Sequence, residues 1–134
     1  MQPSFKYTLE NLEIVSKFFG QIKLPNYNND NHHNKAVIEF RDPSWWKAID
    51  KIENMGLVFC SVDAPGIPRD KIVTNKTIYL RIHGYKDWYR YIYSQTELDT
   101  ILTSIKKASA DKKAIYLNNN HGMLKNGLYL LKNT

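Results

Sequence analysis

The stretch TIYLRIHGYKDWYRYIYSQTEL (residues 77–98) combines a strand, a connection and the start of a helix. Its first eight residues form an apolar run that predicts a buried β-strand, although Arg81 and His83 interrupt it. Ser94 and Glu97 match a capping box, in which each residue bonds a free backbone amide at the N-terminus of a helix. The stretch therefore predicts a β/α unit that carries polar side chains on its strand.

The same alternation of strand and helix recurs on both sides of this unit. Short apolar runs predict three more strands, at residues 36–40, 57–63 and 113–119. Apolar residues at helical spacing predict three more helices, at residues 8–19, 45–54 and 122–133, with Thr8 and Ser44 as N-caps of the first two. Strands that alternate with helices are typical of βαβ units, so we predict an α/β fold with a parallel sheet.

Two segments between these elements predict irregular connections. Residues 25–35 are polar and rich in asparagine. They include His32 and His33, which we interpret as solvent-exposed side chains because no third ligand is spaced to complete a metal site with them. Residues 64–76 contain two prolines and a glycine, which disfavour a regular helix there.

The length of the chain limits the number of domains, and its charge has two interpretations. The 134 residues are enough for one domain with a real core and too few for two ordinary domains. Lys and Arg number 19 against 13 Asp and Glu, which gives a net charge of +6. This excess is compatible with nucleic acid as a partner, but it is also an ordinary solubility charge, which we favour.

The single cysteine, Cys60, lies within the apolar run LVFCSVD, which predicts a small buried side chain and not a nucleophile. One cysteine forms no internal disulfide, as expected in a reducing compartment. The N-terminus has no signal-peptide pattern, and no apolar run approaches the ~20 residues of a membrane span. We therefore predict a cytoplasmic protein with no membrane partner.

Alternate residues of each predicted strand form a set that becomes polar toward the carboxyl end of the strand. The four sets are Val37, Glu39 and Arg41; Phe59, Ser61 and Asp63; Tyr79, Arg81 and His83; and Ile115, Leu117 and Asn119. Because parallel α/β folds bind ligands at the carboxyl ends of their strands, we expect the polar members to converge there. The alternative is a buried ion network in which Glu39 or Asp63 only pairs with Arg81.

The residue types in these sets suggest roles at a binding site. Guanidinium groups hold phosphate or carboxylate well, so Arg41 and Arg81 are candidate ligand-binding residues. The candidates for acid–base catalysis are Glu39, Asp63 and His83. Asn118 and Asn119 are candidates for orienting the ligand. The same two carboxylates and histidine form only a weak pattern for a metal ion, and the absence of phosphate-loop, dinucleotide and zinc motifs leaves the cofactor unspecified.

The aromatic run YKDWYRYIY (residues 85–93) has two interpretations. With Lys86 and Arg90 it could stack on the bases of nucleic acid or on sugar rings. Alternatively, Trp88, Tyr91 and Tyr93 pack as a cluster that holds the connection against the sheet. The sequence favours packing, and the same holds for the tryptophans at positions 45 and 46.

Four strings in this order resemble the YecE-like family, domain of unknown function 72: VIEFRDPSWW (37–46), YLRIHG (79–84), YRYIYSQTEL (89–98) and IYLNNNHG (115–122). The residues that carry the resemblance are Gln2 to Phe5, Glu39, Arg41, Ser44, Trp45, Arg81, His83, Gly84, Tyr93, Ser94, Leu98, Asn118 and Asn119. The resemblance implies a TIM-type barrel distantly related to endonuclease IV and sugar-isomerase barrels. It places the polar residues, including Tyr93 as a ligand contact, at the mouth of the barrel, and implies no established activity.

The length of the chain differs from that of a whole barrel, which needs on the order of 200–250 residues. The resemblance therefore implies that residues 1–134 are a single YecE-like domain, parallel β/α units that form roughly the C-terminal half of a barrel. Three alternatives follow from this expectation. The other half is a separate N-terminal polypeptide, or two copies pair as a homodimer, or the chain is an inactive truncated fragment.

Overall fold

The computed structural model describes residues 1–22 and 36–134, so the expected connection at 25–35, with His32 and His33, lies outside the described residues. Helices and strands alternate along the chain, as the sequence predicts. The elements are α1 (Leu9–Gln21), β1 (Val37–Ile38), the 3₁₀ helix η1 (Pro43–Ala48), α2 (Ile49–Asn54), β2 (Val58–Asp63), β3 (Thr77–Ile82), α3 (Gln95–Lys107), β4 (Lys112–Leu117), the 3₁₀ helix η2 (Asn120–Gly122) and α4 (Met123–Asn133). No helix among them is long and apolar enough to cross a membrane.

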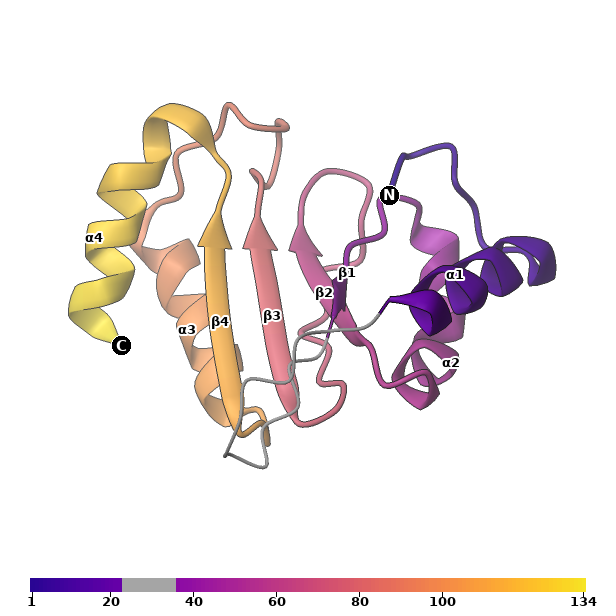
Figure 1. The fold of residues 1–134 in the computed structure, drawn as a ribbon. Coiled ribbons are helices and arrows are strands. Elements are labelled where there is room, and N and C mark those ends of the chain that lie inside the picture. Colours follow the sequence, from indigo (N-terminus) through magenta and orange to yellow (C-terminus); the bar gives the residue numbers. More distant parts are fainter. Residues whose placement is uncertain (23–35) are drawn as a thin grey trace.

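The four strands form one parallel sheet in the order β1-β2-β3-β4. Each strand therefore lies beside its neighbour in the sequence, as in consecutive β/α units. Figure 1 shows α3 behind β3 and β4, α4 beyond the β4 edge, and α1 and α2 at the opposite end, beside β1. The predicted α/β fold with a parallel sheet is confirmed.

The helix caps are confirmed at two positions and wrong at a third. The Thr8 side chain accepts a hydrogen bond from the Asn11 amide at 3.0 Å, and Ser94 and Glu97 form the predicted capping box of α3. The predicted cap Ser44 instead lies inside η1, where its hydroxyl accepts a hydrogen bond from the Tyr7 amide. Asp42 caps this turn, because the following proline is suited to a first helical turn and starts the helix earlier.

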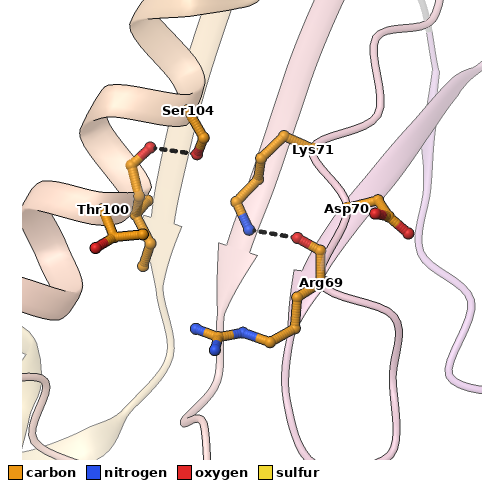
Figure 2. A pocket seen from close by; sticks show the side chains of 6 residues that line it. Arg69, Asp70, Lys71, Thr100 and Ser104 are labelled. Carbon is orange, nitrogen blue, oxygen red and sulfur yellow. Dashed lines mark hydrogen bonds between the residues drawn. The ribbon is translucent and has the colours of Figure 1, made fainter.

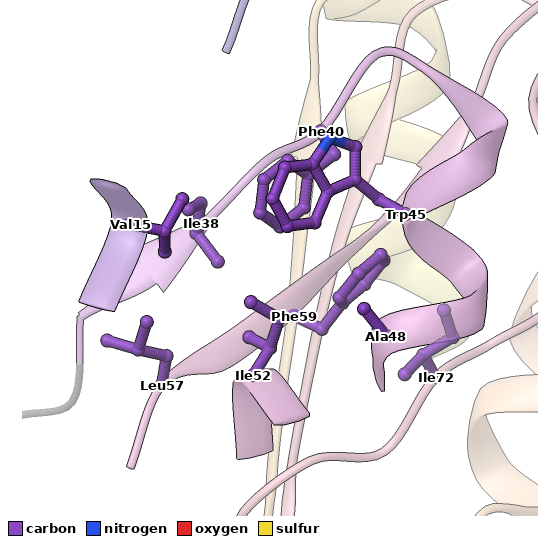
Figure 3. Packing of buried hydrophobic residues seen from close by; sticks show 9 residues of the cluster. All are labelled: Val15, Ile38, Phe40, Trp45, Ala48, Ile52, Leu57, Phe59 and Ile72. Carbon is purple, nitrogen blue, oxygen red and sulfur yellow. The ribbon is translucent and has the colours of Figure 1, made fainter. Parts of the chain in front are cut away.

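Two apolar clusters hold helices against one face of the sheet. The first joins α1, β1, η1, α2 and β2, and Figure 3 shows its buried members: Val15, Ile38, Phe40, Trp45, Ala48, Ile52, Leu57, Phe59 and Ile72. Trp45 stacks on Phe40 at a ring separation of 3.9 Å and donates its indole N–H to the Phe5 carbonyl at 2.7 Å. The predicted packing role of this tryptophan is therefore confirmed.

The second cluster joins β3 to α3 through alternate residues of the strand. Ile78, Leu80 and Ile82 are buried against α3, on the face opposite to Arg81. The α3 residues in this cluster are Leu98, Ile101, Leu102 and Ile105. Because these alternate strand residues face α3, the remaining ones face the other side of the sheet, here called the open face.

The connection between β2 and β3 contains no helix, as its prolines and glycine predict. Two side chains of this region satisfy buried backbone amides in place of regular structure. Ser61 accepts a hydrogen bond from the Ile72 amide, and Thr74 accepts one from the Phe59 amide, both at 2.8 Å. Ser61 thus has a structural partner on the α3 side of the sheet.

Candidate functional site

The open face gathers five polar residues at the carboxyl ends of three strands. Glu39 and Arg41 follow β1, Arg81 lies in β3, and His83 and Asn118 directly follow β3 and β4. We call this group the Glu39 cluster. Alternation along the strands grouped Glu39 with Arg41 and Arg81 with His83, and their positions at strand ends predicted that the two pairs converge. The structure places these four residues together.

Glu39 accepts hydrogen bonds from two arginines, one on each of its carboxylate oxygens. Arg41 Nε donates to Oε1 at 2.9 Å, and Arg81 Nη1 donates to Oε2 at 2.6 Å. His83 Nε2 lies 3.5 Å from the same Oε2. Both arginine side chains keep about a third of their surface exposed, at 29% and 30%, whereas the Glu39 side chain is only 11% exposed. The cluster therefore presents cationic groups to solvent above a nearly buried carboxylate.

The protonation of Glu39 follows from these neighbours. Burial by itself would raise the pKa of Glu39, but hydrogen bonds with His83 and Arg41 and electrostatic interactions with His83 and Arg81 lower the pKa to about 2. Glu39 is therefore a carboxylate throughout the neutral range. It acts as an acceptor that orients its neighbours and is a poor donor of a proton.

His83 is fully buried under the aromatic run. Its ring lies 5.2 Å from that of Trp88 and 5.3 Å from that of Tyr89. The Tyr89 amide donates to the His83 carbonyl at 2.7 Å, and Tyr89 has a positive φ of 66°, which turns the chain back over the histidine. His83 Nδ1 has no hydrogen-bond partner within residues 1–22 and 36–134.

Asn118 completes the cluster from the edge strand. Its Oδ1 accepts hydrogen bonds from Arg81 Nε at 3.0 Å and Nη2 at 2.6 Å. Arg41 also lies over the Trp88 ring, with its guanidinium carbon 5.4 Å from the ring centroid. The two arginines are therefore held at fixed positions by a carboxylate, an amide and an aromatic ring.

Asp63 does not join the cluster, contrary to the prediction. It pairs in register with Ile82, so its side chain lies on the α3 side of the sheet. There it is fully buried and accepts hydrogen bonds from Arg69 Nε at 3.1 Å, Arg69 Nη2 at 2.8 Å and the Tyr93 hydroxyl at 3.0 Å. The β2 residues that face the open side are Val58, Cys60 and Val62, which pair with Val37, Tyr79 and Arg81.

Tyr93, a predicted ligand contact, lies in this second group. It is buried, donates to Asp63 and accepts a hydrogen bond from the Gly84 amide at 3.1 Å. Its ring packs edge-on against Tyr91 at 4.9 Å. Burial, with the nearby Asp63 carboxylate, raises the pKa of Tyr93 well above its usual value. Tyr93 therefore joins the end of β2 to the turn after β3 and does not reach the Glu39 cluster.

Asn119 also lies away from the cluster, because Leu117 pairs with Ile82 and thus faces α3. The Asn119 side chain donates to the Tyr91 carbonyl and to Asn126 Oδ1, both at 2.8 Å. The sequence placed Asn119 on the face of Arg81, whereas its neighbour Asn118 lies there. The predicted convergence is therefore wrong for Asp63 and Asn119, whereas Glu39, Arg41, Arg81 and His83 do lie together.

Two residues with structural roles at these strand ends were missed. Arg69 lies in the irregular connection after β2, and its guanidinium lies 4.0 Å from the centroid of the Tyr85 ring. Asn126 sits inside α4 yet is buried, and it bonds the backbone of Tyr93 on both sides. A buried asparagine within an apolar helix pattern is the signal that could have identified Asn126.

A cavity of about 400 Å³ opens between this connection and α3, lined by Arg69, Asp70, Lys71, Thr100, Ile101 and Ser104. Figure 2 shows that Lys71 bonds the Arg69 carbonyl and Ser104 bonds the helix backbone. The Thr100 hydroxyl also donates to a carbonyl of its own helix, and the Arg69 guanidinium donates to the Asp63 carboxylate. Because these polar groups already have partners within the protein, the cavity does not point to a ligand.

The described residues contain no group of three His, Cys, Asp or Glu side chains that could hold a metal ion. The three residues weighed from the sequence for such a site are split by the sheet, since Asp63 faces α3 while Glu39 and His83 lie on the open face.

Solved structures of DUF72 family proteins share this fold. One from Enterococcus faecalis V583 matches with a TM-score of 0.83 and 21% identity, over 98% of this chain and 55% of that one. One from Thermotoga maritima MSB8 matches with a TM-score of 0.80 and 25% identity, over 98% and 54%. A second E. faecalis structure has a TM-score of 0.76 and 21% identity, over 98% and 57%. The chain thus spans about half the length of these relatives, as expected for parallel β/α units that form half of a barrel.

No curated protein matches the chain. The family described as protein of unknown function DUF72 matches residues 1–130. The resemblance expected from the sequence is therefore confirmed, and the chain belongs to the DUF72 family.

Proposed function

We propose that the Glu39 cluster binds a ligand that carries a phosphate or carboxylate group. The observation that supports this proposal is the pair of arginines around a single carboxylate. Arg41 and Arg81 carry two positive charges against one negative charge, and both remain partly exposed. A guanidinium that is already fixed by protein partners loses little side-chain freedom when it binds an anion.

In this proposal the ligand lies at the carboxyl ends of the strands, where parallel β/α folds bind small molecules. A polyhydroxylated ligand fits the same position, because Asn118 accepts through Oδ1 and its NH₂ group has no partner in the described chain. A sugar phosphate combines both kinds of group and is the ligand class that this set of side chains suits best.

His83 is the residue of this site best suited to transfer a proton. It is the only imidazole of the cluster, it is buried, and its Nδ1 lacks a partner among the described residues. Glu39 is a positioning residue in this proposal, because its low pKa keeps it ionised while it holds His83 and both arginines. Asp63, on the other side of the sheet, has no part in it.

Calorimetric titration with inorganic phosphate, ribose 5-phosphate and ribose tests the proposal. We expect ribose 5-phosphate to bind most tightly, and Arg41→Gln to weaken the binding of both phosphates by about tenfold or more, as loss of a charge-assisted bond does. Arg90→Gln is the matched control, since Arg90 is an exposed arginine of the aromatic run. Equal binding by the Arg41 and Arg90 variants would contradict the proposal.

A second candidate function is non-catalytic binding of nucleic acid by the aromatic run. Tyr85 and Ile92 are exposed there, next to the exposed cations Lys86 and Arg90. Binding of a single-stranded oligonucleotide that weakens steeply with salt, and that depends on Arg90 and not on Arg41, would favour this function. A folded chain that binds neither the phosphates nor the oligonucleotide would favour an inactive fragment.

A further inference from the structure

Both edges of the sheet are open in the described chain. β4 pairs with β3 alone and β1 pairs with β2 alone. Each edge has a helix beyond it, α4 next to β4 and α1 next to β1 (Figure 1). Unpaired strand edges are normally covered in proteins, because their free N–H and C=O groups recruit other strands.

The helix beyond β4 has an apolar side that is largely exposed in the described chain. Leu124, Leu128 and Leu131 are 75%, 58% and 79% exposed. On its other side α4 binds α3, through the Tyr129 hydroxyl to Asp99 and the Asn133 carbonyl to Lys106. Leu131 lies two residues from Tyr129, which is roughly 200° around the helix. The leucines therefore face away from α3, toward the place where the next helix of the ring would lie.

α1, at the opposite end of the sheet, also has a side with exposed apolar residues. Val15 of α1 is buried in the first apolar cluster, whereas Ile14 and Phe18, one turn apart, are 50% and 54% exposed. On the open face, Tyr116 of β4 and Val37 of β1 are also exposed large apolar residues. Exposed apolar residues thus accompany both open edges, on the helices as well as on the strands.

We propose that the two edges form one docking surface for a separate chain of the same family, which supplies the remaining β/α units. The solved relatives support this occupant, because a little under half of each of their chains has no counterpart here. The first strand of the partner pairs with β4, and its last strand pairs with β1. Its helices pack on the leucines of α4 and on Ile14 and Phe18 of α1.

A second copy of this chain fits the surface less well. In a β/α barrel one helix covers the groove between two neighbouring strands. α4 already lies beyond β4, and α1 already lies beside β1. If β1 of a second copy paired with β4, its α1 would enter the groove that α4 occupies, and two helices would compete for one place. The geometry therefore favours a partner whose chain begins and ends with a strand, because such a chain adds no helix to the places that α4 and α1 already fill.

Charge adds a further property of the partner. β4 and α4 expose Lys112, Lys113, Lys125 and Lys132, and neither element contains an acidic residue. The strand and helix that face them are expected to carry Asp and Glu, because like charges across an interface cost affinity.

Co-expression with the segment of the T. maritima relative that this chain does not match provides the test. Native mass spectrometry and light scattering should show a 1:1 complex, and a monomer when this chain is expressed alone. Leu128→Glu or Leu124→Glu should weaken the complex by about tenfold or more, since one leucine leaves the interface and a charge enters it. Thr103→Glu, an exposed change on α3, is the matched control and should have no effect.

Three outcomes would overturn the proposal: a homodimer of this chain alone that Leu128→Glu dissociates, no association on co-expression, or equal weakening by Thr103→Glu. Arg41→Gln keeps this test separate from that of the ligand site. It should lower phosphate binding and leave the complex intact, because the Arg41 side chain bonds Glu39 on the open face, whereas the partner is proposed to bind the strand edges and the exposed sides of α1 and α4.

Discussion

Glu39 is the residue that orders the open face, because two arginines and a histidine converge on its carboxylate. Its two oxygens are used by different cations, so removal of one cation leaves a nearly buried charge with incomplete compensation. The stability of the cluster is therefore expected to depend on the ionisation of this one side chain.

Arg81→Leu should lower the free energy of unfolding by about 2 kcal/mol at pH 7, a value reduced from that of a fully buried pair because Arg81 is partly exposed. The pKa of Glu39 lies at about 2 in the folded protein and at 4.5 when unperturbed, so its ionisation stabilises the fold above pH 4.5 and this contribution is lost as the pH falls to 2. The difference between wild type and variant should shrink over this range. Urea denaturation at several pH values measures it.

The matched control for this change is Lys17→Ala. Lys17 pairs with Glu13 at 2.7 Å, but both side chains are mostly exposed, so their pair contributes little. Equal stability of wild type and Arg81→Leu at pH 7, or a difference that persists unchanged at pH 2, would contradict the assigned role of Glu39.

Asn126 in α4 also has several polar groups that depend on it for hydrogen bonds in a buried region. Asn126→Leu leaves the Tyr93 amide and the Tyr93 carbonyl without partners in a buried region and removes one of the two acceptors of the Asn119 amide group, and should cost about 3 kcal/mol or more. Thermal unfolding measures the loss. Asn133→Ala, which removes an exposed bond to the Tyr129 carbonyl, should change stability by less than about 0.5 kcal/mol. A similar loss in both variants would show that the buried asparagine has no special role.

At the scale of elements, the turn after β3 determines whether the aromatic run covers His83. Gly84 has a φ of 127°, a conformation that other residues rarely adopt, and its amide bonds Tyr93. A Cβ at this position would collide with the Asp87 carbonyl oxygen and come within 2.8 Å of the Tyr91 side chain.

Gly84→Ala should therefore destabilise the protein by about 2 kcal/mol or more and change the amide chemical shifts of residues 85–93. Gly20→Ala is the control, because Gly20 lies in α1 with open space around it. This change should stabilise the helix by up to about 1 kcal/mol. Unchanged shifts across the aromatic run in the Gly84 variant would refute the importance of this turn.

The elements were predictable from the sequence, but the alignment of their faces was not. Side-chain alternation identifies which residues of one strand share a face, and it grouped Arg81 with His83 and Glu39 with Arg41. It does not say which set of the next strand lies beside them, and a shift of one residue exchanges the two faces. β2 is buried along its whole length, so polarity gave no sign that Cys60 and Val62, and not Asp63, lie on the same face as Arg81. Asn118 and Asn119 are identical in type, so only the register distinguishes them.

At the scale of the whole molecule, protection of the backbone should decrease from the centre of the sheet to its edges. β2 and β3 have strands on both sides and clusters against them, whereas β1 and β4 have one neighbour each in the described chain. Hydrogen exchange of the isolated chain should be slowest in β2 and β3 and fastest in β4 and α4. Uniform protection across the four strands would show that the edges are already covered.

Cys60 lies at the centre of the sheet on its open face, fully buried between the Glu39 cluster and Tyr79. Burial, with the nearby Glu39 carboxylate, raises the pKa of its thiol to about 12, so the folded protein keeps it protonated and unreactive. As the only cysteine in the sequence, Cys60 is a natural chemical probe for opening of the folded protein. The rate at which a thiol reagent labels Cys60 would report how often the sheet exposes its interior, with no engineered probe.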